Sequence, residues 1–93
     1  MPYSASYKKR FAEGNRVRKK GDAEAAIKIL RKLAAEFPKK AAAHLVIGMI
    51  LWDEGSLSAA SREFRVITRL FPKLEIASLG LFHTLWAQSK RTA

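Results

Sequence analysis

Apolar side chains recur every three or four residues along the chain, the spacing that places them on one face of an α-helix. The helices predicted in this way cover residues 7–20, 41–54 and 75–89, with a second helix between Asp22 and Pro38 and a fourth between Ser56 and Pro72. The two clearest stripes, in the second and fourth helices, are Ala26, Ile29, Leu30, Leu33 and Phe37, and Ala60, Phe64, Ile67 and Phe71. No alternating pattern typical of strands competes with them, so we predict an all-α fold of five helices.

Glycine, proline and short polar residues mark the ends of these helices. Gly21 and Gly55 suit helix C-termini, and Asp22 can accept hydrogen bonds from the free N–H groups at the start of the second helix. Ser56 or Ser58 could do the same for the fourth helix. Proline cannot continue a helix, so the second and fourth helices should end before Pro38 and Pro72.

The chain also repeats itself with a shift of 34 residues. The matching pairs are Gly14 and Gly48, Gly21 and Gly55, Ala25-Ala26 and Ala59-Ala60, and Phe37-Pro38-Lys39 and Phe71-Pro72-Lys73. A second shift places Leu45, Leu51 and Trp52 on Leu79, Leu85 and Trp86. A fixed period in this range indicates stacked helical repeats.

Small residues at repeated positions predict close contacts between helices. Gly14 and Ala26 in one repeat, and Gly48 and Ala60 in the next, should lie where two antiparallel helices cross, because larger side chains would separate the helix axes. A glycine within a helix costs about 1 kcal/mol relative to alanine. Two repeats have a glycine at matching positions in spite of this cost, which suggests that close contact between the helices requires it.

Length and composition limit the remaining possibilities. The 93 residues fit one small domain, and the absence of cysteine excludes disulfides and thiolate chemistry. The longest apolar run, residues 45–52, is far shorter than the roughly 20 residues of a membrane span. The first residues lack the apolar core of a signal peptide, so we expect a cytoplasmic protein or a trimmed chain.

Positive charge is concentrated in the first repeat. The net charge is +10, and residues 1–40 supply +8 of it, with twelve Lys or Arg against four Asp or Glu. A field of this kind accelerates association with acidic partners and supports non-specific binding to nucleic acid. Lysines on the outer face of a helix are also often simply solvated.

Catalytic chemistry has few candidate residues. The two histidines, His44 and His83, lie in different repeats, and there is no cysteine to accompany them as nucleophile or metal ligand. The glycines follow the repeat and form no phosphate-binding loop. We therefore predict no enzyme activity, no metal site and no cofactor.

The pattern resembles the tetratricopeptide repeat. It has a small residue midway in the first helix, Gly-Asp or Gly-Ser at the turn, alanine in the second helix, large apolar residues four and seven positions later, and then proline. The resemblance covers residues 7–40, residues 41–74 and a partial third repeat, residues 75–89, within one domain spanning residues 1–93. It implies a helix-turn-helix solenoid of about two and a half repeats. The third repeat departs from the pattern at Phe82 and Ser89.

The resemblance also implies a binding face. In this family the first helix of each repeat lines a concave groove that binds a peptide or a partner helix, and the family is one of scaffolds and adaptors. The corresponding residues here are Lys8, Phe11, Asn15, Arg18, Lys19, Leu45, Met49, Trp52, Leu79, His83 and Trp86. Such a groove would be basic at its N-terminal end and apolar-aromatic beyond, and would suit a protein or peptide with acidic and large apolar residues. An aromatic or methionine at helical spacing is, however, often a core residue instead.

Two alternatives stay open at this point. The fifth helix is surrounded by large apolar residues and would cap a stack poorly, which favours a homo-oligomer or a domain swap through Ile76, Leu79, Phe82, Leu85 and Trp86, or a chain that lacks its last helix. The basic residues of the first helix favour nucleic-acid binding instead. Tyr7 and Phe11 are the only aromatic residues among these basic residues, so few side chains are available for stacking on bases.

Overall fold

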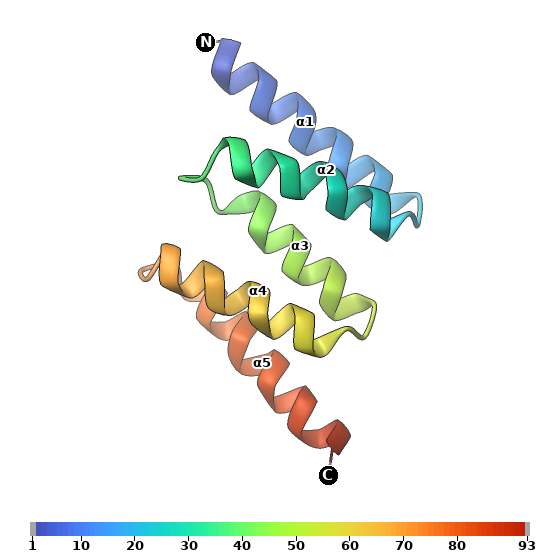
Figure 1. The fold of residues 1–93 in the computed structure, drawn as a ribbon, viewed down its shortest axis with the longest axis vertical. Helices are drawn as coiled ribbons and strands as arrows, with labels where there is room; N and C mark the ends of the chain where they lie inside the picture. Colours follow the sequence, from blue (N-terminus) through green and yellow to red (C-terminus); the bar gives the residue numbers. More distant parts are fainter. Residues whose placement is uncertain (1, 93) are drawn as a thin grey trace. The chain divides into compact units, whose positions relative to one another are not determined.

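The structure is a computed structural model that describes residues 2–92 as five α-helices joined by short turns (Figure 1). The helices are α1 (Pro2–Lys19), α2 (Ala23–Glu36), α3 (Ala42–Asp53), α4 (Leu57–Leu70) and α5 (Glu75–Thr92). Within this described range there is no strand, which confirms the predicted all-α class. The sequence located every helix, although α1 begins and α5 ends a few residues beyond the predicted limits.

The chain divides into two compact units, Met1–Ala43 and His44–Ala93. The first unit contains α1 and α2, and the second contains most of α3 together with α4 and α5. The arrangement of residues 1–93 as a single domain stays a prediction. Each unit is described separately below.

The helix ends follow the local sequence signals. Gly21 and Gly55 adopt positive φ angles of 94° and 79°, which side chains with a Cβ rarely tolerate. The Asp22 carboxylate accepts a hydrogen bond from the Ala25 N–H at 3.1 Å and caps α2 as predicted. Ser56 occupies the N-cap position of α4, but its side chain makes no capping hydrogen bond.

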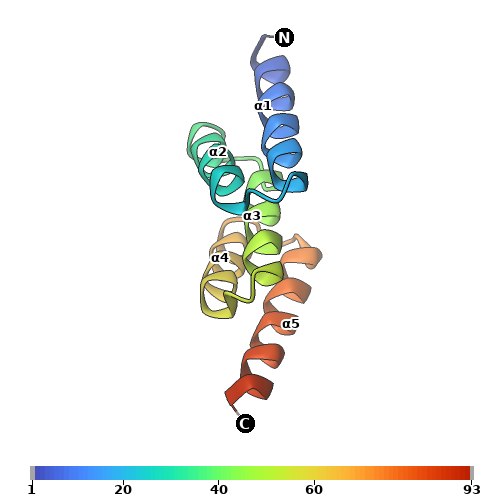
Figure 2. The same ribbon diagram turned by 90° about the vertical axis from the view of Figure 1, so that its right-hand side faces the viewer.

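In the first unit, α1 and α2 pack side by side as an antiparallel pair (Figures 1 and 2). A Cβ atom added at Gly14 would lie 2.8 Å from Cδ2 of Leu30, closer than real contacts allow. The predicted close approach is therefore present, although Gly14 faces Leu30 rather than Ala26. Ala26, Leu30 and Leu33 are fully buried.

An aromatic cluster joins α1 to the chain that follows α2. The Tyr7 ring stacks on Phe11 at 5.9 Å between centroids and meets the Phe37 ring edge-on at 5.2 Å. Lys40 places its ammonium 4.9 Å from the centre of the Tyr7 ring. Burial raises the pKa of the Tyr7 phenol above its usual value, an effect that the Ala43 backbone partly opposes. Tyr7 is therefore a neutral core residue.

In the second unit, the Phe64 ring of α4 lies against two glycines from two different helices. A Cβ added at Gly48 of α3 would lie 2.8 Å from the Phe64 ring, and one added at Gly80 of α5 would lie 2.6 Å from it. Phe64 belongs to a buried cluster with Ala60, Ile67 and Ala77. The absence of a side chain at positions 48 and 80 is what lets both helices approach this ring.

Gly80 also explains the departure from the repeat pattern at Phe82. The period predicts a small residue at position 82, yet the Phe82 side chain is 63% exposed. In α5 the position without room for a side chain is Gly80, two positions earlier, where an added Cβ would lie 2.6 Å from the Phe64 ring of α4. Phe82 therefore fits the structure without a clash, because it points away from the Phe64 ring.

We predict that Gly80→Ala destabilises the protein through the Phe64 ring. Crowding a packed core costs about 1–3 kcal/mol, and alanine regains up to about 1 kcal/mol of helix propensity, so a net loss of about 1 kcal/mol is expected. Urea denaturation of the single variants Gly80→Ala and Phe64→Leu and of their double variant measures the coupling.

The loss caused by Gly80→Ala should disappear in the Phe64→Leu background, where the ring is absent. Ser78→Ala, at an exposed position of the same helix, is the matched control and should change the free energy of unfolding little. An equal loss with and without the Phe64 ring would show that this contact is not what requires glycine.

Candidate functional site

The second unit contains an apolar pocket between α3 and α5. Its volume is about 280 Å³, and most of its wall is apolar. The lining residues are Met49, Trp52 and Asp53 from α3, Phe64 from α4, and Gly80, His83 and Thr84 from α5. The pocket thus lies where two helices converge on the Phe64 ring.

The deep part of the pocket has little capacity to bind a polar group. Phe64 and Gly80 present a ring and a backbone without a side chain. The Thr84 hydroxyl is buried and donates a hydrogen bond to the Gly80 carbonyl at 2.7 Å, so its proton is already used within α5. An apolar group from a ligand would therefore be favoured here, because a polar one would lose its water without compensation.

The rim of the pocket is more varied. Met49 and Trp52 expose 45% and 37% of their surface, and Asp53 and His83 are exposed beside them. Trp and Met combine a large apolar area with adaptable contacts, which suits a surface that meets another molecule. The site therefore joins an apolar interior to a rim with one carboxylate and one imidazole.

Three of the residues predicted from the sequence come together at this pocket, namely Met49, Trp52 and His83. Leu79 and Trp86 are exposed on α5 but do not line it, and Leu45 is partly buried against the Phe64 cluster. Leu45 is therefore a packing residue in the structure.

The predicted basic residues lie in the first unit. Lys8 and Lys19 are exposed on α1, whereas Phe11, Asn15 and Arg18 are half-buried. None of these five lines the pocket between α3 and α5. Their part in binding stays a prediction.

Arg10, on the same helix, has a structural role. Its guanidinium donates two hydrogen bonds to the Glu36 carboxylate, one of them at 3.0 Å, and so ties α1 to the end of α2. The hydrogen bond from Arg10 holds the pKa of Glu36 below its ordinary value, and Glu36 raises the pKa of Arg10. The charge of Arg10 is therefore paired with Glu36 inside the first unit.

A polar pair that the sequence analysis did not find joins α3 to α4. His44 Nδ1 lies 2.8 Å from Glu63 Oε2, and both side chains are largely buried. Glu63 belongs to a helix whose other buried residues are mostly apolar, so its carboxylate needs this partner. The only feature of the sequence that could have indicated this pair is a single glutamate, Glu63, next to the apolar stripe of the fourth helix.

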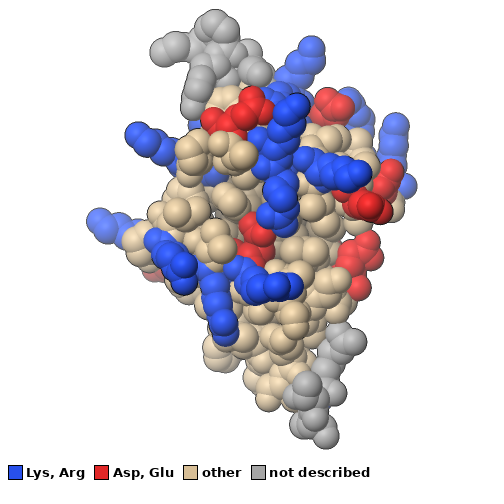
Figure 3. Space-filling view, in the orientation of Figure 1, with Lys and Arg blue, Asp and Glu red and all other residues tan. Residues whose placement is uncertain are grey.

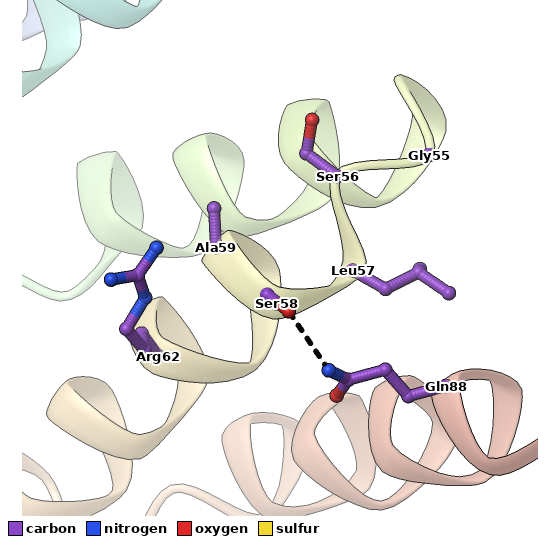
Figure 4. A pocket seen from close by; sticks show the side chains of 7 residues that line it. All are labelled: Gly55, Ser56, Leu57, Ser58, Ala59, Arg62 and Gln88. Atoms are coloured by element: carbon purple, nitrogen blue, oxygen red, sulfur yellow. Dashed lines mark hydrogen bonds between the residues drawn. The ribbon is translucent and has the colours of Figure 1, made fainter. Parts of the chain in front are cut away.

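A second, larger pocket of about 540 Å³ lies at the start of α4 (Figure 4). It is lined by Gly55, Ser56, Leu57, Ser58, Ala59, Arg62 and Gln88. The Gln88 amide donates a hydrogen bond to the Ser58 hydroxyl at 3.0 Å, and the Arg62 side chain points away from this pair (Figure 4). The pocket therefore offers no converging set of polar groups for a ligand.

Within residues 2–92, no group of three or more His, Asp or Glu side chains is arranged as a metal site. In the same range, no helix combines the length and the apolar character needed to cross a bilayer.

Comparison with known families agrees with this architecture. A family model described as the tetratricopeptide repeat matches residues 18–87, which is most of the chain. The chain belongs to the tetratricopeptide repeat family. This confirms both the resemblance seen in the sequence and the helical-repeat fold. A search of curated proteins found no match.

Membership of the tetratricopeptide repeat family has a general functional meaning. These repeats typically mediate protein–protein interaction, are typically not catalytic, and generally bind proteins or peptides. The pocket between α3 and α5 is compatible with that role, because it offers apolar contact area and no group of converging catalytic side chains.

We predict that the Arg10–Glu36 pair stabilises the fold at neutral pH and not in strong acid. The folded-state pKa of Glu36 lies below its unfolded value, so its contribution is complete above the unfolded pKa and disappears as the pH falls through the folded pKa. Because Glu36 is exposed to solvent and Arg10 is partly exposed, the effect should be small and should weaken with salt.

Denaturation of the wild type and Glu36→Gln at neutral pH and near pH 2 tests this, with the same pair of chains made in an Arg10→Gln background as control. The difference should be present only at neutral pH and only with Arg10 in place. A difference that persists without Arg10 would assign the effect of Glu36 to another interaction.

Proposed function

We propose that this tetratricopeptide repeat chain is a scaffold or adaptor module that binds a protein segment by a large apolar side chain. The side chain enters the pocket between α3 and α5, and the rest of the segment contacts Trp52, Met49 and His83 at the rim. The apolar pocket over the Phe64 ring is the observation that carries the proposal.

The dimensions of the pocket support a side chain rather than a free metabolite. Sites that enclose small molecules are usually about 300–1,000 Å³, with several polar groups that fix the orientation of the ligand. This pocket is smaller, at about 280 Å³, and its deep polar group, the Thr84 hydroxyl, already donates to Gly80. One aromatic or long aliphatic side chain fits both its volume and its chemistry.

The charge of the chain supports an acidic partner. Residues 1–40 carry a net charge of +8, and Lys8 and Lys19 of α1 are exposed. A segment that carries Asp or Glu would be attracted by this field, which acts mainly on the association rate and falls with ionic strength.

Selection from a random peptide library displayed on phage tests the proposal, with the full chain as bait. We expect the selected peptides to share a large apolar residue and to be enriched in Asp or Glu. Trp52→Ala should weaken a selected peptide by about tenfold or more, as loss of a buried aromatic contact does in other interfaces. Fluorescence anisotropy of the labelled peptide measures this affinity.

Val66→Ala is the matched control, because Val66 is an exposed apolar residue of α4 in the same unit and does not line the pocket. It should leave the affinity unchanged. Peptides that bind Trp52→Ala as well as the wild type, or that share no large apolar residue, would contradict the proposal.

A further inference from the structure

The outer face of α5 is apolar and exposed. Five large side chains of this helix expose between 38% and 63% of their surface, and they are Ile76, Leu79, Phe82, Leu85 and Trp86. From residue 76 to residue 89 the helix carries no Asp, Glu, Lys or Arg. In the part of the chain that the structure describes, no other element covers these side chains.

The two ends of this face carry opposite charges. Glu75, Leu79, Phe82, Trp86 and Lys90 follow one another at spacings of four, three, four and four residues. At 3.6 residues per turn, these spacings place all five within about a quarter of the helix circumference. The face thus begins with a carboxylate, continues with three large apolar groups and ends with an ammonium.

Contacts within α5 agree with this arrangement. The Lys90 ammonium lies 4.5 Å from the centre of the Trp86 ring, so it stays on the same face as the apolar groups. The Phe82 ring meets the His83 ring edge-on at 5.7 Å between centroids. These contacts hold the Phe82, Trp86 and Lys90 side chains in place within a single copy of the chain.

We propose that this face binds the same face of a second copy, with the two α5 helices antiparallel. In that arrangement Glu75 of each copy faces the partner's Lys90, Leu79 faces the partner's Trp86, and the two Phe82 rings meet near the twofold axis. The pattern is self-complementary, as an interface between identical subunits must be.

Charge selects this face and the antiparallel orientation among the ways in which two copies could meet. The molecule carries a net charge of +10, so two copies repel each other over most orientations. Residues 75–90 carry one acidic and one basic side chain, and the antiparallel arrangement places opposite charges together at both ends. Figure 3 views α5 from the side of α4 and not from its outer face; on this side too, the lower part, where Figure 1 shows α5, is tan rather than blue or red.

The area of the face allows only a weak dimer. An aromatic side chain buries about 150–250 Å², so Leu79, Phe82 and Trp86, each rather more than half exposed, offer roughly 300 Å² per copy, and Ile76 and Leu85 on the two flanks of the face add roughly 100 Å². Two copies together bury roughly 800 Å², below the range of about 1,200–2,000 Å² for stable interfaces, so the pairing should be weak. The dimer should therefore depend on concentration.

Sedimentation velocity at increasing concentration tests the pairing. We expect the wild-type mass to rise from 10.4 kDa toward twice that value by roughly 100 µM, as a small interface predicts. Leu79→Glu should abolish the dimer, because it buries two unpaired charges. Val66→Glu, which changes an exposed apolar residue of α4, is the control and should dimerise like the wild type.

Charge reversal tests the antiparallel register. Glu75→Lys or Lys90→Glu alone places like charges together at both ends of the pair and should weaken dimerisation by roughly tenfold. The double variant restores opposite charges and should recover the affinity of the wild type. Circular dichroism of each variant separates loss of pairing from loss of helix.

Three results would overturn the proposal. They are a wild type that stays monomeric at roughly 100 µM, a Leu79→Glu variant that still dimerises, and a double charge variant that is no better than the single ones. These variants leave Trp52 and Met49 intact, so failure here is distinct from failure of the proposed peptide site.

Discussion

The second unit depends on the Phe64 ring and the two glycines that face it. Gly48 and Gly80 bring the backbones of α3 and α5 to one aromatic side chain, at distances that exclude even a methyl group. The ring then fills the space between three helices and forms one wall of the apolar pocket. One buried side chain therefore sets both the packing of the unit and the chemistry of its candidate site, because a core is packed too densely for either glycine to be replaced freely.

The contact at Gly80 also fixes the rotation of α5 about its own axis. With Gly80 turned toward α4, residues roughly half a turn away along the 3.6-residue period must point outward. Phe82 and Trp86 lie on that outward side, and the exposure of both follows from this geometry. The apolar outer face is thus a consequence of the same constraint that forms the pocket, and the two surfaces share one helix.

The sequence predicted those features of the fold that depend on neighbouring residues. Gly21 and Gly55 mark helix ends by their positive φ angles, and Asp22 caps α2, because each acts on its own turn of backbone. The 34-residue period indicated stacked helical repeats, which the family match confirms, because each repeat must present the same small and large residues to its neighbours.

Features that depend on a distant partner were harder to predict. The period placed the small residue of the third repeat at position 82, whereas Gly80 makes the contact, since the rotation of α5 is set by Phe64 of another helix. The sequence did not predict the His44–Glu63 pair for the same reason, because no residue near either one in the sequence indicates which side chain it contacts. Of the predicted groove residues in the second unit, Met49, Trp52 and His83 reach the pocket, whereas Leu45 packs against the core.

The pocket and the outer face of α5 are close enough on the helix to influence each other. His83 lines the pocket and also contacts the Phe82 ring, so it stands at the border between them. A ligand confined to the pocket would leave Leu79 and Trp86 available to a second copy. A longer segment that extended over these two residues would compete with the second copy, and each event would weaken the other by the same factor, because linkage is reciprocal. The length of the partner segment would then decide whether this chain binds it as a monomer or as a pair.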